Sequence, residues 1–120
     1  MDEICKIKDL YRALYTFEKE FQQKYDITIN EAMLLCSMSD GVARSANEIC
    51  EFIGLSSSRG SRVINTTESK KFILRHMGEE DKRQMIFTLT ESGEKKLSEM
   101  HSESIAIMEK FKTILSQFIN

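Results

Sequence analysis

The sequence has no proline, no long apolar run and no closely spaced cysteines. No segment approaches the ~20 consecutive apolar residues of a membrane-spanning helix, so we expect no membrane partner. The N-terminal segment MDEICKIKDL lacks the basic-then-apolar order of a secretory signal, which favours a cytoplasmic protein. Because it also lacks repeats and low-complexity stretches, the sequence of residues 1–120 predicts a single domain with no linker.

The residues that most often carry catalysis or bind metals are sparse. Cys5, Cys36 and Cys50 are odd in number and form no CxxC pair, so neither a disulfide scaffold nor a zinc site is expected. Neither His76 nor His101 has an obvious cysteine or carboxylate partner for acid-base work, and there is no glycine-rich phosphate loop. We therefore expect no enzyme activity, no cofactor and no metal, with Cys36 and Cys50 packed inside apolar runs.

The net charge of -2 hides an uneven distribution along the chain. The acidic excess lies toward both ends, whereas the middle of the sequence is basic. Between Leu55 and Arg83 the basic residues are Arg59, Arg62, Lys70, Lys71, Arg75, Lys82 and Arg83, against the acidic residues Glu68, Glu79, Glu80 and Asp81. The net charge therefore does not exclude a nucleic-acid partner.

Apolar residues recur at three- and four-residue steps through residues 4–25, which predicts one face of a long helix. These residues are Ile4, Ile7, Leu10, Tyr11, Leu14, Phe17, Phe21 and Tyr25. We expect the helix to end at Asp26. Thr28 and Glu31 then have the spacing of a capping box, and the apolar block 32–36 predicts a second, buried helix.

The next segment predicts a helix-turn-helix. Ser45 and Glu48 form a second capping box for a short helix that stops at Gly54, and Ser56 can cap the helix that follows. At about 100° per residue, that last helix has two distinct sides. One of these sides is rich in serine, asparagine and arginine, which hydrogen-bond base edges and phosphates. This side favours a DNA-binding helix, and an ordinary helical hairpin is the alternative. The first side carries Gly60, Val63, Ile64 and Thr67, and the second carries Ser58, Arg62, Asn65, Thr66 and Ser69.

Two strand-like runs, FILRHM and QMIFTLT, flank the polar turn 78–83 and predict a β-hairpin. A helix-turn-helix followed by a hairpin is the layout of a winged helix. The expected fold is therefore mainly α with a small β-hairpin wing, in which the winged helix-turn-helix lies between N- and C-terminal helices. The turn GEEDKR forms the tip of the wing.

The segments LSSSRGSRVINTTESKKFILR and GEEDKRQMIFTLTESG together resemble the recognition helix and wing of the multiple-antibiotic-resistance regulator (MarR) family. The resemblance covers essentially the whole chain and implies a winged-helix transcription factor. It implies dimerization helices in residues 1–26 and 92–120 and a DNA-binding winged helix-turn-helix in residues 28–91. The family has an Asp-x-Arg pair at the wing tip and then Leu-Thr-x-x-Gly, found here at Asp81, Arg83, Leu89, Thr90 and Gly93.

The chain departs from the family pattern in the recognition helix. The family usually has a leucine at the position of Thr67 and a helix-closing glycine at the position of Lys71. Gly60 also lies inside the predicted helix, at a cost of roughly 1 kcal/mol relative to alanine. These departures could change the length of the recognition helix and the angle at which it docks on DNA. They do not remove its basic face.

We expect double-stranded DNA to be the partner of the recognition helix and the wing. Asp81 would hold the Arg83 guanidinium in one orientation for a narrow minor groove. The alternative is a solvated turn whose exposed ion pair contributes under ~1 kcal/mol to stability. The candidate DNA-binding residues are Ser57, Ser58, Arg59, Ser61, Arg62, Asn65, Thr66, Lys82 and Arg83.

The C-terminal helix has an apolar stripe broader than a lone surface helix needs, which predicts a homodimer. A twofold dimer would place two recognition helices about 34 Å apart and predicts a pseudo-palindromic operator. The stripe contains Leu97, His101, Ser104, Met108, Phe111, Leu115 and Phe118, widened by Met100, Ile105, Ile107, Ile114 and Ile119.

Three interpretations of control and function stay open. The resemblance implies a small aromatic or amphipathic ligand near Tyr11, Tyr15, Phe17 or Met33, although these side chains also fit as plain core residues. A hydroperoxide-sensing branch of the family has its reactive cysteine near the start of the first helix, where this chain has Cys5, and a helix N-terminus favours the thiolate. In the third interpretation the dimer binds another protein and uses the winged helix only as a scaffold.

Overall fold

The first and last helices of the chain pack on each other in the computed structural model, which describes residues 2–118. These residues divide into two units: a terminal unit of residues 2–28 and 99–118, and a central unit of residues 29–98. The elements are α1 (Asp2–Tyr25), α2 (Ile29–Cys36), β1 (Arg44–Ser45), α3 (Ala46–Ile53), α4 (Ser57–Ser69), β2 (Ile73–Met77), β3 (Met85–Leu89), α5 (Glu91–Ser102) and α6 (Ser104–Ser116).

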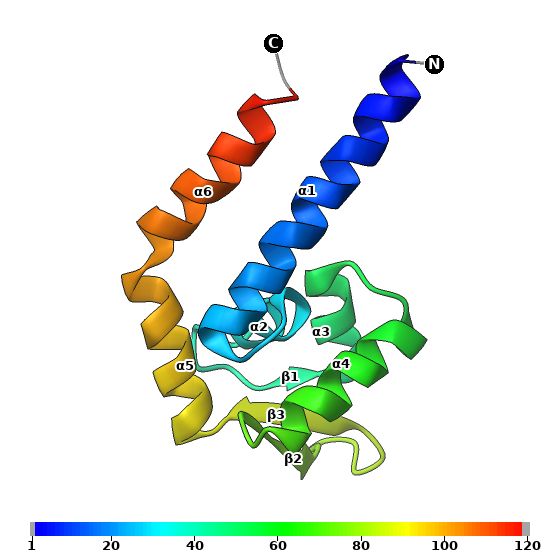
Figure 1. Cartoon of the computed structure of the whole chain (residues 1–120). Helices are drawn as coiled ribbons and strands as arrows, with labels where there is room; N and C mark the ends of the chain where they lie inside the picture. The colour runs from blue at the N-terminus through cyan, green and yellow to red at the C-terminus, as the bar shows by residue number, and fades with distance from the viewer. Residues whose placement is uncertain (1, 119–120) are drawn as a thin grey trace. The chain divides into compact units, whose positions relative to one another are not determined.

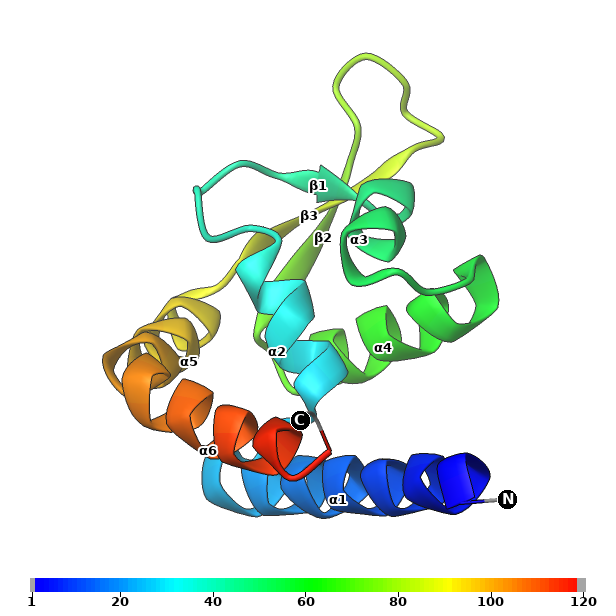
Figure 2. The ribbon, with the colours of Figure 1, turned by 90° about the horizontal axis from the view of Figure 1, so that it is seen from above.

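In the terminal unit, α1 and α6 run antiparallel, so that the start of α1 and the end of α6 lie at the same end (Figure 1 and Figure 2). Aromatic rings hold the two helices together. Phe17 meets Phe111 edge-on at 5.6 Å between ring centroids, and the Phe21 ring lies 4.8 Å from that of Tyr25. The apolar periodicity of residues 4–25 therefore predicted α1 correctly, including its end before Asp26.

The C-terminal region differs from the prediction of one continuous helix, because it breaks at Glu103 between α5 and α6. The Glu103 carboxylate accepts hydrogen bonds from the Tyr25 hydroxyl and from Lys24 Nζ, the latter at 2.9 Å. These two donors hold the pKa of Glu103 below its usual range, with the Tyr25 hydroxyl as the larger cause. The predicted apolar stripe is thus distributed over two helices, and its last member, Ile119, lies outside the described residues.

The central unit is a winged helix, as the sequence predicted. Helices α2, α3 and α4 surround a core that continues into a three-stranded antiparallel sheet of order β1-β3-β2. In the hairpin, Ile73 pairs with Leu89 and Met77 with Met85, and the loop 78–84 projects beyond the helices of this unit (Figure 2). The buried apolar residues include Leu34, Leu35, Met38, Ile49, Ile64, Ile73 and Phe87.

Local signals set the helix ends of this unit. The capping box predicted at Ser45 and Glu48 is present, and Gly54 ends α3 in the left-handed conformation with φ 86°. The Ser45 backbone N–H is the first cause that lowers the pKa of the Glu48 carboxyl. The sequence did not predict β1, a two-residue strand that pairs with β3 through Arg44 and Ser45. Helix α2 is also less enclosed than predicted, because Met33 and Cys36 are exposed.

Candidate nucleic-acid interface

Helix α4 begins at the predicted cap and packs closely against α3. Ser56 Oγ accepts a hydrogen bond from the Arg59 backbone N–H at 3.3 Å. Gly60 is buried, and a Cβ atom at this position would lie only 2.1 Å from Cys50 Sγ. The glycine that weakens the helix in isolation therefore permits its close approach to α3. The buried Cys50 is a packing residue, as predicted.

The outward face of α4 carries most of the side chains that the sequence assigns to DNA binding. The Thr66 hydroxyl donates to the Val63 carbonyl at 3.0 Å, so part of its hydrogen-bonding capacity is used within the helix. Within residues 2–118, no hydrogen bond or ion pair engages the side chains of Arg59, Arg62 or Asn65. These three side chains are free to bind a partner. The exposed residues on this face are Ser57, Ser58, Arg59, Ser61, Arg62, Asn65 and Thr66.

Two other basic residues of the middle segment are engaged in the fold. Lys70 Nζ lies 2.8 Å from a carboxylate oxygen of Glu31 on α2. Arg75 on β2 donates through two nitrogens to Glu68 on α4, at 3.1 and 3.3 Å, and stacks 5.3 Å from the centre of the Phe87 ring. The sequence analysis grouped these two cations with the other basic residues of the middle segment, because an ion pair between distant residues cannot be recognised from the local sequence.

The wing tip contains the predicted pair of Asp81 and Arg83. Asp81 Oδ1 accepts from the Arg83 backbone N–H at 3.0 Å and lies 3.4 Å from Arg83 Nε. The contact to the backbone N–H fixes the backbone of the turn. The contact to Nε restrains the Arg83 side chain, which is 94% exposed. Gly78 permits the tight loop, because a Cβ atom there would lie 2.6 Å from the Asp81 carbonyl oxygen. Lys82 is also exposed.

The Leu-Thr-x-x-Gly motif forms a junction between the end of α4 and the start of α5. Thr90 Oγ1 donates to the Lys71 carbonyl at 2.7 Å and accepts from the Gly93 backbone N–H at 3.0 Å. A side chain at Gly93 would place a Cβ atom 2.2 Å from the Phe72 carbonyl oxygen. Lys71 has φ 66°, the left-handed conformation that favours glycine, which explains physically why a glycine would suit this position.

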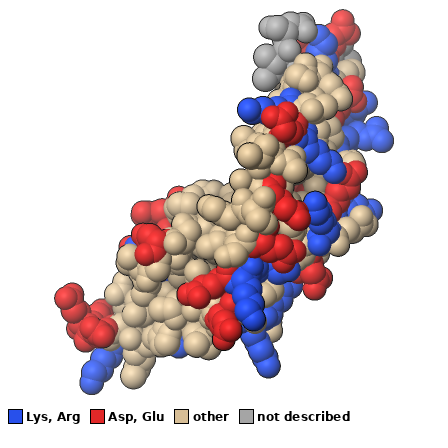
Figure 3. Space-filling view, turned by 90° about the vertical axis from the view of Figure 1, so that its left-hand side faces the viewer, with Lys and Arg blue, Asp and Glu red and all other residues tan. Residues whose placement is uncertain are grey.

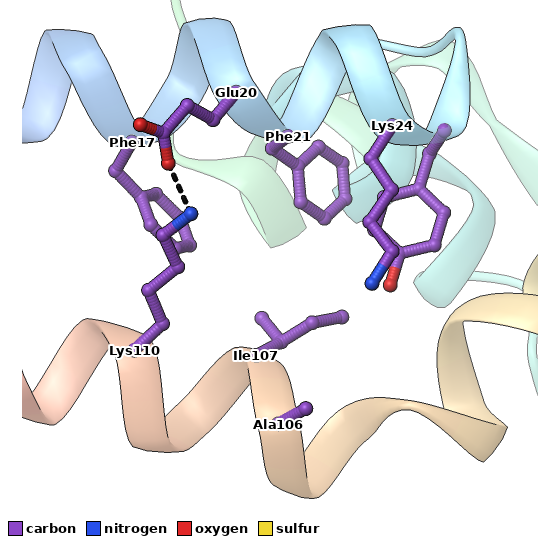
Figure 4. Close-up of a pocket in the computed structure, with 8 residues that line it drawn as sticks. Phe17, Glu20, Phe21, Lys24, Ala106, Ile107 and Lys110 are labelled. Atoms are coloured by element: carbon purple, nitrogen blue, oxygen red, sulfur yellow. Dashed lines mark hydrogen bonds and ion pairs between the residues drawn. The ribbon is translucent and has the colours of Figure 1, made fainter.

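The terminal unit holds a cavity of about 160 Å³ between α1 and α6 (Figure 4). Its wall is apolar, formed by Phe17, Phe21 and Ile107, while Lys24 and Lys110 lie at its edge. Lys110 is paired with Glu20 across the opening. This arrangement could hold a small apolar or aromatic molecule.

The structure brings only one of the four candidate ligand residues to this cavity. Phe17 lines it, whereas Tyr11 and Tyr15 are exposed on α1 and Met33 belongs to α2 in the central unit. Sequence reasoning missed Phe21, although the four-residue step from Phe17 indicated that both rings share a face.

The exposed cysteines differ from the prediction in one respect. Cys36 at the end of α2 is exposed, so the prediction that it is an enclosed packing residue is wrong. Partial desolvation nevertheless raises the pKa of its thiol, which lowers the fraction of reactive thiolate. Cys5 is exposed on α1, and its role as an oxidation sensor stays a prediction.

Three further observations concern surface charge, metal binding and membrane spans. On the face drawn in Figure 3, lysine and arginine side chains are interspersed with carboxylates, so this face lacks a field of one sign. In residues 2–118, no group of histidine, cysteine and carboxylate side chains is arranged to hold a metal ion. No helix among these residues is both long and apolar enough to cross a bilayer.

Comparison with known proteins identifies the family. Residues 16–100 match the family model described as Transcriptional regulator SarA/Rot. YwaE of Bacillus subtilis (strain 168), an uncharacterized HTH-type transcriptional regulator, is 25% identical over 107 residues. The alignment covers 86% of this chain and 63% of YwaE, so the chain spans less than two thirds of the length of that relative.

Solved structures share the fold at low sequence identity. Apo MarR from E. coli has a TM-score of 0.71 at 18% identity, with coverage of 88% of this chain and 82% of MarR. BpsR from Bordetella bronchiseptica has a TM-score of 0.68 at 23% identity, with coverage of 83% and 78%. These identities establish a common fold alone. Because the family match covers the whole of the winged helix and well beyond half of the sequence, the chain belongs to the SarA/Rot family of transcriptional regulators and has the winged-helix fold of MarR-type regulators.

Proposed function

We propose that the chain binds duplex DNA as a homodimer, with α4 in the major groove and the wing tip in the adjacent minor groove. The observation that carries the proposal is the outward face of α4, where Arg59, Arg62 and Asn65 have no partner within the described residues. Arginine can bind guanine bidentately, and asparagine can bind adenine in the same way. The exposed serines of the same face, Ser57, Ser58 and Ser61, are small enough to let the helix backbone approach the bases.

The wing supplies the second contact. A guanidinium at Arg83 suits the negative potential of a narrow minor groove, and Lys82 adds a phosphate contact beside it. Asp81 restrains this tip through the backbone and side chain of Arg83. Residues 28–91 are therefore proposed as the DNA-binding segment.

The terminal helices are proposed to form the dimer interface, through residues 1–26 and 92–120. Ile4, Tyr11 and Tyr15 are exposed on a side of α1 that lies more than about 100° around the axis from Phe17, which faces α6. Ile105 and Met108 are likewise exposed on α6. Large apolar side chains in such number on paired helices favour coverage by a second copy. A twofold dimer would then read a pseudo-palindromic operator.

A small molecule is proposed to modulate this activity. DNA binding by BpsR is regulated by 6-hydroxynicotinic acid, a small aromatic acid. The cavity lined by Phe17 and Phe21 in the terminal unit has aromatic walls, which suit an aromatic molecule. A ligand carboxylate would compete with Glu20 for Lys110 and with Glu103 for Lys24. Oxidation at Cys5 remains the alternative signal.

The proposal is tested by selecting duplexes from a random library with the purified protein. We expect enrichment of a pseudo-palindromic sequence. Arg62→Ala should weaken binding to the enriched duplex by ~1 to 3 kcal/mol and remove the preference at one position in each half-site. A uniform loss across all sequences would assign Arg62 to a phosphate instead. Failure to enrich any sequence would favour the scaffold interpretation, and an enriched duplex that Arg62→Ala binds as well as the wild type would contradict DNA recognition by α4.

A further inference from the structure

A buried carboxylate connects the central helix α2 to the end of α4. Glu31 is 2% exposed, and among residues 2–118 it is the one carboxylate classed as buried. Its Oε1 lies 2.8 Å from Nζ of Lys70, the residue that caps the C-terminal end of α4. The pair spans 39 positions of sequence and joins two elements of the central unit.

Net stability is a poor explanation for such a pair. Desolvation of the Glu31 carboxylate offsets much of its attraction to Lys70, whose side chain is 35% exposed, and an apolar pair of similar volume is often at least as stable. A charge-assisted hydrogen bond does, however, fix the distance and direction between its partners more narrowly than apolar contact does. The pair is therefore well suited to fixing the orientation of α4 relative to α2.

The same end of α4 has two further anchors. Glu68 binds Arg75 on β2 at 3.1 and 3.3 Å, and the Lys71 carbonyl accepts from Thr90 Oγ1 at 2.7 Å. None of these anchoring side chains belongs to the set proposed to contact DNA. The end of α4 is thus tied to α2, β2 and the start of α5 by polar contacts, in addition to the apolar packing of the buried Ile64.

We propose that Glu31 and Lys70 are positioning residues that set the angle at which α4 meets the major groove. This inference rests on the proposed DNA-binding role of α4. Base contacts require closely defined placement of Arg62 and Asn65, whereas sequence-independent binding needs mainly the cations. Loss of the pair should therefore reduce binding to the selected duplex more than binding to duplexes of unrelated sequence.

The test uses the double variant Glu31→Leu/Lys70→Met, which replaces both charges by apolar side chains. We expect a melting temperature close to that of the wild type, at least about tenfold weaker binding to the selected duplex, and less than about twofold change for an unrelated duplex. Lys70→Arg, which keeps a cation opposite Glu31, should retain the wild-type ratio of the two affinities. Lys82→Met is the matched control, because loss of a phosphate contact should weaken both duplexes and lower the salt slope.

Hydrogen exchange separates this inference from the proposed function. Backbone amides of residues 69–72 should exchange faster in the double variant, while those of α3 keep their protection. An unchanged affinity ratio in the folded double variant would overturn the positioning role. Unchanged exchange at residues 69–72 would overturn the anchoring itself, whether or not DNA binds. If the wild type binds no duplex, the proposed function fails, and the positioning role in DNA recognition fails with it.

Discussion

The residues at the wing tip illustrate how one carboxylate can serve a DNA-binding loop. Three acidic side chains precede Lys82 and Arg83, which is unfavourable for a loop that only attracts phosphate. Asp81 has a separate use, because its Oδ1 contacts both the backbone N–H and Nε of Arg83. The carboxylate thereby limits the orientations of a side chain that is otherwise almost fully exposed.

This geometry predicts the same direction of effect for both members of the pair. Arg83→Ala should leave the melting temperature nearly unchanged, weaken binding to the selected duplex at least about tenfold and lower the salt slope by about one for each chain of the dimer. Asp81→Ala should also weaken binding, although it removes a negative charge near DNA. Asp81→Asn keeps an acceptor for the Arg83 backbone N–H and should have a smaller effect. Tighter binding by Asp81→Ala, measured by fluorescence anisotropy, would contradict the orienting role.

At the level of elements, local patterns predicted most of the fold because they act within a few residues. The capping box at Ser45 and Glu48, the cap at Ser56 and the amphipathic division of α4 are all present. Gly60, Ile64 and Thr67 are buried, as the 100° periodicity required, while Arg62 and Asn65 are exposed. The hairpin also occurs where the strand-like runs flank the polar turn.

The features that sequence reasoning missed depend on tertiary contacts. No proline or glycine lies at the break between α5 and α6, so the sequence gives no sign of it. The break occurs at Glu103, whose carboxylate contacts Lys24 and Tyr25. Strand β1 is too short to show a periodicity of its own and exists through its pairing with β3. The pairs of Glu31 with Lys70 and of Glu68 with Arg75 are likewise invisible until the chain is folded.

The packing of α3 against α4 yields a prediction about Gly60. Gly60→Ala should destabilise the protein, because the new Cβ atom would lie 2.1 Å from Cys50 Sγ and force the helices apart. We expect a loss of ~1 to 3 kcal/mol in the free energy of unfolding, despite the better helix propensity of alanine. Cys50→Ala removes the sulfur atom and should restore stability when combined with Gly60→Ala.

A double-mutant cycle measured by urea denaturation checks this contact. The combined variant should be more stable than the sum of the two single changes predicts. Additive effects would mean that the contact between Cys50 and Gly60 does not determine how closely α3 and α4 pack.

For the whole molecule, the terminal helices should govern assembly. Removal of residues 111–120 deletes the contact between Phe17 and Phe111 and the last turns of α6, and should yield a monomeric or insoluble species. Ile105→Glu is a milder change, because this side chain is 79% exposed within one chain and tolerates charge unless a partner covers it.

Sedimentation velocity at micromolar concentration distinguishes these outcomes. The wild type should sediment as a dimer and Ile105→Glu as a folded monomer. Asn47→Glu places the same charge at an exposed position of α3, outside the segments proposed for the interface, and should leave the dimer intact. A stable wild-type monomer would refute the proposed assembly.

The central claim is that the exposed cations of α4 and the wing neutralise DNA phosphates and read its bases. The most direct measurement is the affinity of the wild-type protein for its selected duplex across a series of salt concentrations. Arg59, Arg62, Lys82 and Arg83 offer four cations per chain, so a dimer should show a linear fall of log K with log salt, with a slope of magnitude up to about 7. An affinity that does not change with salt, or no measurable binding at low salt, would contradict the account.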